Sequence, residues 1–276
     1  MKIFVTGGTG FIGSHFLKQA VAAGHSVVVL RRAGSEPRVA LQFAPEWAEG
    51  KLDDDWSEKL SQCQAVVHLA AAGVSPQTAG WDELFEVNVR QSLNLWRQAA
   101  KAGVKQLLVC GSCFEYGQSG ERYEFIPANA PLEPTHAYAA SKAAATMAAL
   151  ALAREHQLEL LMLRPFHAFG EGEEKTRFWP ALRRAALTGE DFPMTAGEQV
   201  RDFVPVETVA ENFVAALVRT DLRAGAPKIE NVGTGKPQTL RAFAEYWWRH
   251  WEAKGKLKIG EMPYRANEVM RYVPQI

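Results

Sequence analysis

The sequence lacks an excess of charge of either sign and lacks any long apolar run. Its 31 lysines and arginines balance 31 aspartates and glutamates, so the chain has no overall basic character of the kind that attracts nucleic acid or an anionic membrane surface. No apolar run approaches the roughly 18 residues of a membrane-spanning helix. We therefore expect neither nucleic acid nor a membrane among the partners, and any anionic ligand must be held by local charges.

Cysteine is also scarce. Only Cys63, Cys110 and Cys113 are present, an odd and small number that does not suit a disulfide framework. The chain opens on a strand pattern rather than on a charged and then apolar signal sequence. Both absences favour a reducing, cytoplasmic setting. A hydrophobic content of 47% is enough for the large core of a globular protein.

The first residues supply a strand, a glycine-rich turn and a helix in succession. Residues 2–6 form an apolar run, the next seven read Gly-Gly-Thr-Gly-Phe-Ile-Gly, and residues 14–23 have a helical pattern. Glycines at these spacings permit a tight turn, let a pyrophosphate approach the backbone and let the helix pack against the strand. The amides at the helix N-terminus then face the phosphate. The cofactor contacts predicted in this turn are Gly7, Gly10, Phe11, Ile12 and Gly13.

The end of the second expected strand, 26–30, lacks a carboxylate. A fold of this kind that prefers NAD usually places Asp or Glu there for the ribose 2′-hydroxyl, whereas this chain has Arg31 and Arg32. Two guanidinium groups suit a 2′-phosphate. We therefore expect NADP(H) as the cofactor. NAD(H) is the alternative, in which both arginines are merely solvated.

Strand and helix patterns alternate through the first part of the chain. Further strand patterns at 65–69, 106–110 and 159–164 are separated by helical patterns such as 81–102 and 141–156. This alternation predicts an α/β fold, a Rossmann-type doubly wound parallel sheet with helices on both faces.

Beyond Pro165 the pattern breaks into segments rich in aromatic residues, proline and glycine. We expect residues 1–165 to form a cofactor-binding domain that includes the catalytic residues, and residues 166–276 to form mainly a smaller substrate-binding domain. Two later strand patterns, 203–206 and 229–232, could return to the main sheet, in which case the two domains interleave.

Tyr138 and Lys142 stand four residues apart in the helical pattern. Positions i and i+4 share a helix face, so the ammonium group can lie near the phenol and lower its pKa. A phenolate can take the hydroxyl proton when a secondary alcohol gives a hydride to nicotinamide, and the phenol can return that proton in the reverse direction. Tyr138 is therefore a candidate acid and base, and Lys142 can also bind the nicotinamide ribose.

The spacing from the glycine turn to Tyr138 and Lys142 resembles that of the extended short-chain dehydrogenases/reductases, a family branch of nucleotide-sugar epimerases, dehydratases and ketoreductases. The resemblance covers nearly the whole chain. It implies that Ser112, four residues before Tyr116, orients the reacting sugar oxygen from the carboxyl end of a parallel strand. It also implies that Asn88 supports the active-site helix. Further cofactor contacts implied by the resemblance are Leu69, Ala70, Ala71, Tyr138, Lys142 and Pro165.

The residues after Ser112 bear on the type of reaction. Family dehydratases carry an Asp-Glu pair there, where this chain has Cys113 and Phe114. Elimination then has no obvious proton donor and base, which disfavours dehydration. Reduction of an NDP-4-keto-6-deoxy sugar with NADPH is the preferred prediction, because of Arg31 and Arg32. Alternatives are a 4-epimerase with tightly bound NAD, a non-catalytic NADP-binding sensor or scaffold, and a reductase of a non-nucleotide carbonyl.

Other matches imply a nucleotide-diphosphate sugar as the substrate. Arg201 and Arg265 stand in segments that resemble those whose arginines meet the diphosphate, and guanidinium suits bidentate phosphate contacts. His167 replaces a frequent asparagine, and Cys113 is either an acid or base or a small packed residue. The predicted substrate contacts are Ser112, Cys113, His167, Arg201 and Arg265. No metal is expected. The family often dimerises through two helices, for which 81–102 and 141–156 are the candidates.

Overall fold

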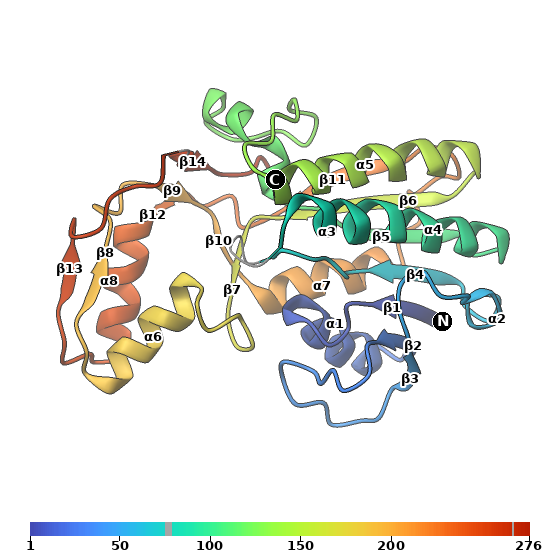
Figure 1. Ribbon diagram of the computed structural model, residues 1–276, viewed down its shortest axis with the longest axis horizontal. Helices are drawn as coiled ribbons and strands as arrows, with labels where there is room; N and C mark the ends of the chain where they lie inside the picture. The colour runs from blue at the N-terminus through green and yellow to red at the C-terminus, as the bar shows by residue number, and fades with distance from the viewer. Residues whose placement is uncertain (75–78, 267) are drawn as a thin grey trace.

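The computed structural model describes residues 1–74, 79–266 and 268–276, and its centre is a seven-stranded sheet (Figure 1). All neighbouring strands are parallel. From one edge to the other the order is β11 (Lys228–Val232), β6 (Glu159–Pro165), β5 (Gln106–Cys110), β4 (Ala65–His68), β1 (Lys2–Thr6), β2 (Ser26–Arg31) and β3 (Glu46–Glu49). The order reverses between β1 and β4, and a crevice for a ligand opens at the carboxyl ends of strands at such a point. The predicted doubly wound parallel sheet is confirmed.

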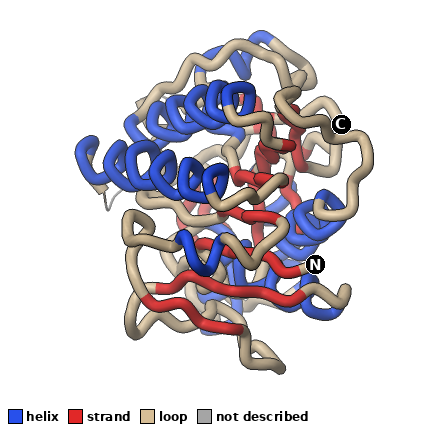
Figure 2. The backbone as a smooth tube through the Cα atoms, turned by 90° about the vertical axis from the view of Figure 1, so that its right-hand side faces the viewer, coloured by secondary structure: helices blue, strands red, loops and turns tan. Residues whose placement is uncertain are grey.

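Helices cover both faces of this sheet, as the view along its edge shows (Figure 2). One face carries α3 (Trp81–Phe85), η1 (Glu86–Gln91), α4 (Ser92–Lys101) and α5 (Ala137–Glu155). The other face carries α1 (Phe11–Ala22) and α7 (Val206–Ala216), while the short α2 (Ser57–Leu60) precedes β4. Within the described residues, no helix has the length and apolar character needed to cross a membrane.

The alternation of side chains along the strands divides the core into two layers. Ile3 and Val5 of β1 pack with Phe16 of α1 and Phe213 of α7. Phe4, between them, packs on the opposite face with residues of α4 and α5. Successive strand residues point to opposite faces, so a strand that is apolar throughout is stable only where helices cover both sides.

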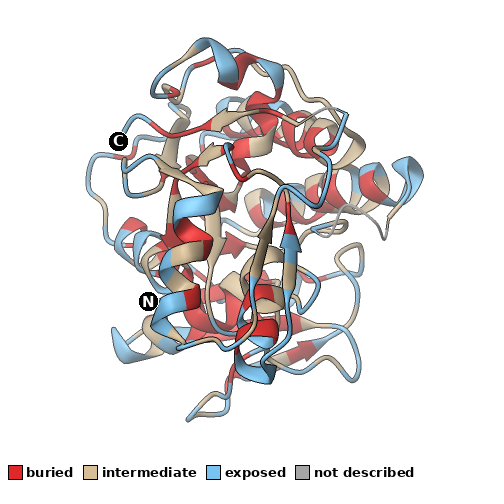
Figure 3. Cartoon of the chain, turned by 90° about the vertical axis from the view of Figure 1, so that its left-hand side faces the viewer, coloured by how far each residue is buried: buried red, intermediate tan, exposed pale blue. Residues whose placement is uncertain are grey.

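Shorter elements gather beyond the carboxyl ends of the main strands, at the left of Figure 1. Many of their residues are only partly buried (Figure 3). The helices there are α6 (Phe178–Thr188) and α8 (Leu240–His250), and 3₁₀ turns η2 (Cys113–Tyr116) and η3 (Gln118–Arg122) follow β5. Three small sheets pair β7 (His167–Phe169) with β10 (Phe203–Pro205), β8 (Phe192–Met194) with β13 (Leu257–Ile259), and β9 (Val200–Arg201) with β12 (Gln238–Thr239) and β14 (Arg271–Tyr272).

The two late strand patterns have different positions. The segment 228–232 lies in the main sheet as β11, beside β6. The expectation that 203–206 could return to that sheet is wrong, because β10 pairs with β7 instead. Both edges of β6 are already taken by β5 and β11, and β10 pairs with the short β7 that follows β6. The division at residue 165 stays a prediction.

Candidate active site

In the glycine turn after β1, the backbone packs so closely that side chains at two of the glycines would not fit. Gly7 has φ +71°, and a Cβ there would lie 2.5 Å from the Ala70 amide nitrogen. A Cβ on Gly13 would lie 2.0 Å from the Gly7 carbonyl oxygen. Gly10 caps α1 without any side-chain hydrogen bond, so the first amides of this helix are available to an anion. The turn lies against Leu69 and Ala70, and the arrangement fits a dinucleotide pyrophosphate.

Ser112, Tyr138 and Lys142 are brought together by two elements. Ser112 lies two residues after the end of β5. Tyr138 lies in the first turn of α5, which His136 caps by accepting a hydrogen bond from the Ala139 amide at 3.3 Å. The Ser112 side chain lies close enough to the Tyr138 hydroxyl to lower its pKa. Lys142, one helical turn later, donates from Nζ to the backbone carbonyl at the end of β5. The structure thus gathers the three residues at the carboxyl edge of the sheet.

The protonation state of Tyr138 differs from the sequence expectation. Burial raises the pKa of its hydroxyl, the nearby Cys110 and Glu115 raise it further, and the hydrogen bond with Ser112 lowers it only in part. The ammonium group of Lys142 is directed to the Cys110 carbonyl oxygen, 2.7 Å away. Tyr138 is therefore held as a phenol, the form that donates a proton.

Asn88 holds the start of α5 in place. Its Oδ1 accepts from the Ala72 amide at 2.7 Å, and its Nδ2 donates to Ser141 Oγ at 3.0 Å. Ser141 in turn donates to the Tyr138 carbonyl oxygen at 2.8 Å. Asn88 lies in η1, a π-helical turn, and such turns are frequent at functional sites. This turn links the loop after β4 to the helix that carries Tyr138.

A buried carboxylate that the sequence reasoning missed fixes Ser112. Glu115 is fully buried; its Oε1 accepts from the Ser112 amide at 2.8 Å, and its Oε2 accepts from Arg164 at 2.9 Å and from Thr146 at 2.7 Å. A buried ion pair is tolerated when its remaining hydrogen bonds are satisfied. The sequence Ser-Cys-Phe-Glu has the Ser-x-x-Glu spacing of a capping box, and this spacing is the signal from which the role of Glu115 could have been predicted.

The sequence as a whole matches one family of enzymes. A model of the NAD dependent epimerase/dehydratase family matches residues 3–233. The chain belongs to this family. It is therefore an enzyme of the extended short-chain dehydrogenase/reductase type, which confirms the resemblance inferred from the glycine turn, Tyr138 and Lys142.

Relatives within the family have more than one activity. UDP-glucose 4-epimerase of Corynebacterium glutamicum is 28% identical over 265 residues, which cover 89% of this chain and 79% of that protein. dTDP-6-deoxy-L-talose 4-dehydrogenase (NAD(+)) of Aggregatibacter actinomycetemcomitans is 26% identical over 277 residues, 98% of each chain. The solved structure of Thermus thermophilus UDP-glucose 4-epimerase in complex with NAD matches at TM-score 0.82 and 26% identity, covering 100% of this chain and 90% of that one.

Arg31, at the end of β2, does not point freely toward a cofactor 2′-phosphate as the sequence led us to expect, because it is paired within the chain. Arg31 donates to Glu49 at 2.7 Å and lies 3.5 Å from Glu36, and its guanidinium stacks 4.5 Å from the centre of the Trp47 ring. Two carboxylates therefore already balance its charge. Arg32 is exposed on the following loop. The prediction of NADP(H) loses one of its two supporting groups.

The substrate side of the site is lined with aromatic rings. Phe114 packs edge-on against His136, His167 and Tyr272, with ring centres 5.5, 5.8 and 5.9 Å apart. Cys113, just before it, is buried, and burial raises the pKa of its thiol to about 12. A thiol in this state is not a base near neutral pH, which favours the interpretation of Cys113 as a small packed residue.

Arginines approach this side from three segments. Arg201 is buried and donates to Glu268 at 2.7 Å and to the Val269 carbonyl at 2.6 Å, so its guanidinium is largely used within the chain. Arg265 is exposed, and its charge, after burial, lowers the pKa of His136. Arg177, which the sequence reasoning missed, is close enough to Cys113 and His167 to act on both pKa values.

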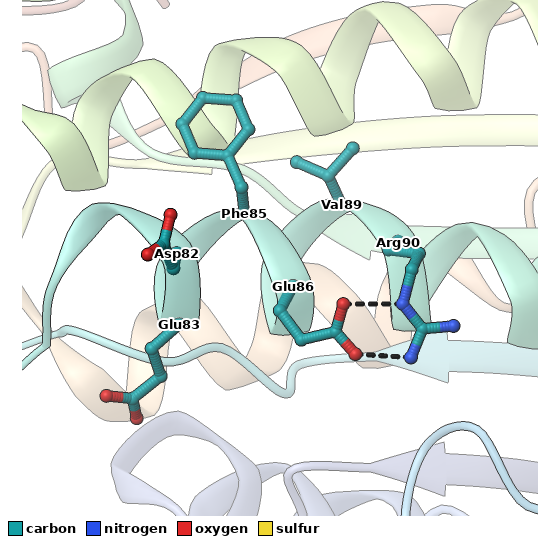
Figure 4. A pocket seen from close by; sticks show the side chains of 6 residues that line it. All are labelled: Asp82, Glu83, Phe85, Glu86, Val89 and Arg90. Atoms are coloured by element: carbon teal, nitrogen blue, oxygen red, sulfur yellow. Dashed lines mark hydrogen bonds and ion pairs between the residues drawn. The ribbon is translucent and has the colours of Figure 1, made fainter.

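A separate pocket of about 710 Å³, open to solvent, lies on α3 and η1. Figure 4 shows Phe85 and Val89 on one side of this helical segment and the Glu86–Arg90 ion pair on another. Asp82 and Glu83 complete its lining. None of these residues belongs to the predicted catalytic or cofactor set.

Pro165, a predicted cofactor contact, is buried at the end of β6.

Proposed function

We propose that this enzyme reduces the C4 carbonyl of an NDP-4-keto-6-deoxy sugar. The observation that carries the proposal is the position of the buried Tyr138 beside Ser112 at the carboxyl edge of the sheet, where burial raises its pKa, with Cys113 and Phe114 in the place of an acid pair. The nicotinamide cofactor, held at the glycine turn, supplies the hydride. A reduction needs a proton donor at the substrate oxygen, and a phenol is that donor.

Each residue of the set has a separate role in this reaction. Ser112 hydrogen-bonds the C4 oxygen and orients it. Tyr138 gives its proton to that oxygen as the carbonyl becomes a secondary alcohol, and it then regains a proton from solvent. Lys142, whose Nζ donates to the Cys110 carbonyl at 2.7 Å, lies one helical turn after Tyr138 and binds the nicotinamide ribose.

We propose NAD(H) rather than NADP(H) as the cofactor. Arg31 is paired with Glu49 and Glu36, and a 2′-phosphate would have to displace these carboxylates. The Aggregatibacter actinomycetemcomitans relative is named as an NAD(+) enzyme. That relative also matches this chain over 98% of both lengths and is named as acting at position 4 of a 6-deoxy sugar, which supports the reductase proposal.

A 4-epimerase is the second candidate, because the Corynebacterium glutamicum and Thermus thermophilus relatives are named as UDP-glucose 4-epimerases. The two proposals differ in how the cofactor is used. An epimerase retains NAD tightly, whereas a reductase exchanges NADH at each turnover. A non-catalytic sensor is disfavoured, since a binder needs no gathered set of Ser112, Tyr138 and Lys142.

The test combines cofactor extraction with turnover. We expect purified protein to release little NAD on denaturation and to oxidise NADH when given an NDP-4-keto-6-deoxy sugar. Stoichiometric bound NAD together with interconversion of UDP-glucose and UDP-galactose would replace this proposal by the epimerase. Thermal shifts with UDP, CDP, GDP and dTDP test the nucleotide: stabilisation by none of them would favour a non-nucleotide carbonyl.

We also propose a homodimer formed through α3 and α5. Trp81 and Met147, on these neighbouring helices, are each 60% exposed, and Trp81 stacks on Phe85 with ring centres 5.8 Å apart. Exposed large apolar side chains on adjacent helices suit a helix-packed interface. Sedimentation should give a dimer for the wild type and a monomer for Trp81→Glu combined with Met147→Glu. A wild-type monomer at micromolar concentration would refute the proposal.

A further inference from the structure

His167, the first residue of β7, has an unusual environment for a histidine. Its ring lies among Phe114, Phe203 and Tyr272, with ring centres 5.8, 6.2 and 6.0 Å away. Its Nδ1 is buried and has no hydrogen-bond partner in the described part of the chain. Leaving a buried polar atom unpaired costs about 1–3 kcal/mol. A ligand that supplies the missing hydrogen bond removes that cost.

The charge state of His167 restricts which ligand group it can bind. Burial lowers its pKa well below the usual value, and the charges of Arg201 and Arg177 lower it further. The neutral imidazole has one N–H donor and one acceptor nitrogen. A hydroxyl group, which both donates and accepts, is a suitable partner for such a ring.

Phe114 packs against His167 and also against His136, the neighbour of the proton donor. Its amide donates to Ser112 Oγ at 3.3 Å, which holds it beside the residue that orients the reacting oxygen. Its ring also packs against His136, whose ring is nearly parallel to that of Tyr138 with centres 6.3 Å apart. The Phe114 ring is partly exposed and can make no strong hydrogen bond. A sugar whose carbon against this ring carries no hydroxyl therefore binds more tightly than one whose hydroxyl would lose its hydrogen bonds to water there.

We propose that Phe114 and His167 form a wall that selects the sugar: the Phe114 ring packs against the C6 methyl group of a 6-deoxy sugar, and the His167 imidazole hydrogen-bonds a hydroxyl of the same sugar. The inference rests on the proposed function, since it takes the reacting carbonyl to lie at Ser112 and Tyr138. It goes beyond that function by assigning the selection of the sugar to two residues outside the proton-transfer set.

The test measures binding in a Tyr138→Phe background, where turnover does not interfere. Thermal shifts first identify which of UDP, CDP, GDP and dTDP stabilises the protein most. Three probes are then compared: this nucleoside diphosphate alone, its glucose derivative and its 6-deoxyglucose derivative. We expect the 6-deoxy sugar to bind at least about 10-fold more tightly than the glucose derivative. If the two sugar derivatives bind equally well to the protein with Phe114 and His167 unchanged, the proposal is overturned.

Two pairs of variants separate the roles of the wall residues. Phe114→Asn should bring the two sugar affinities within about 2-fold of each other, while the apolar control Phe114→Leu keeps the preference. His167→Leu should weaken both sugars about 10-fold and leave the nucleoside diphosphate alone unchanged, while His167→Gln should restore most of the loss. A merely structural role would weaken all three probes together, and that result would overturn the assignment of His167.

Failure of the proposed function has a different signature. If none of the four nucleoside diphosphates stabilises the chain, the nucleotide-sugar proposal itself fails. If the wild type binds nucleotide sugars and reduces no 4-keto sugar, the reductase proposal fails. Loss of the sugar preference in an active reductase refutes only the role of the Phe114–His167 wall.

Discussion

Glu115 Oε1 accepts a hydrogen bond from the Ser112 amide at 2.8 Å, while its other oxygen accepts from Arg164. The hydroxyl that faces Tyr138 therefore depends on an ion pair buried behind it. Ser112 and Glu115 form the capping box of η2, so a change at the buried carboxylate alters a hydrogen bond of Ser112 itself.

Glu115→Gln should destabilise the protein strongly. The substitution leaves the Arg164 guanidinium buried without a counter-charge, which costs about 3–5 kcal/mol. Urea unfolding measures the free energy of unfolding, and Glu58→Gln, at an exposed position, is the matched control that should stay within about 0.5 kcal/mol of wild type. A small effect at both positions would show that the ion pair does not stabilise the fold.

Tyr138→Phe should lower kcat for carbonyl reduction by about 10²–10⁴-fold, because the proton donor is lost. Since burial raises the pKa of this tyrosine above its ordinary value, the wild-type hydroxyl stays protonated through neutral pH. We therefore expect the rate of reduction to show no titration of Tyr138 between about pH 6 and 9. A wild-type-like rate in a folded Tyr138→Phe protein would remove Tyr138 from the mechanism.

Glu173 should make stability depend on pH near neutrality. Burial raises its pKa from 4.5 to about 7, so between these values the folded state binds a proton that the unfolded state has released. Stability therefore falls as pH rises through this window, by about 3 kcal/mol for this group. Denaturant unfolding at several pH values should show that Glu173→Gln lacks this fall.

Glu174→Gln is the control for that measurement. Glu174 is adjacent in sequence but lies near the surface, and the hydrogen bond with Arg38 lowers the pKa of its carboxyl. Its substitution should leave the fall between about pH 5 and 7 in place. If Glu173→Gln and wild type have parallel pH profiles, Glu173 does not titrate in that range.

Cofactor choice should respond to the partners of Arg31. In Glu36→Gln combined with Glu49→Gln, the Arg31 guanidinium loses both carboxylates and can bind a 2′-phosphate. We expect the ratio of kcat/KM for NADPH to that for NADH to rise about 10-fold, from a wild-type ratio below one. Adding Arg31→Ala should cancel the gain. A wild type that prefers NADPH would contradict the NAD(H) proposal.

The local structure of the candidate cofactor site was predictable from local pattern. The strand, glycine turn and helix at 2–23 depend on neighbouring residues alone, because Gly7 needs a positive φ and Gly13 needs the absence of a Cβ. The spacing of Tyr138 and Lys142 on one helix likewise follows from helical periodicity. The predicted sheet strands recur with bounds that differ from the observed ones by one residue at most.

The sequence could not predict which distant group each charged side chain binds. By itself it determined the parallel sheet, the glycine cradle and the positions of Ser112, Tyr138 and Lys142. Only the tertiary structure decided that Arg31 pairs with Glu49 on the adjacent strand and that Lys142 points to the Cys110 carbonyl. Backbone preferences act between neighbours in the chain, whereas a charged side chain binds whichever group packing brings near it. Burial, which only the packed fold produces, likewise raises the pKa of Tyr138.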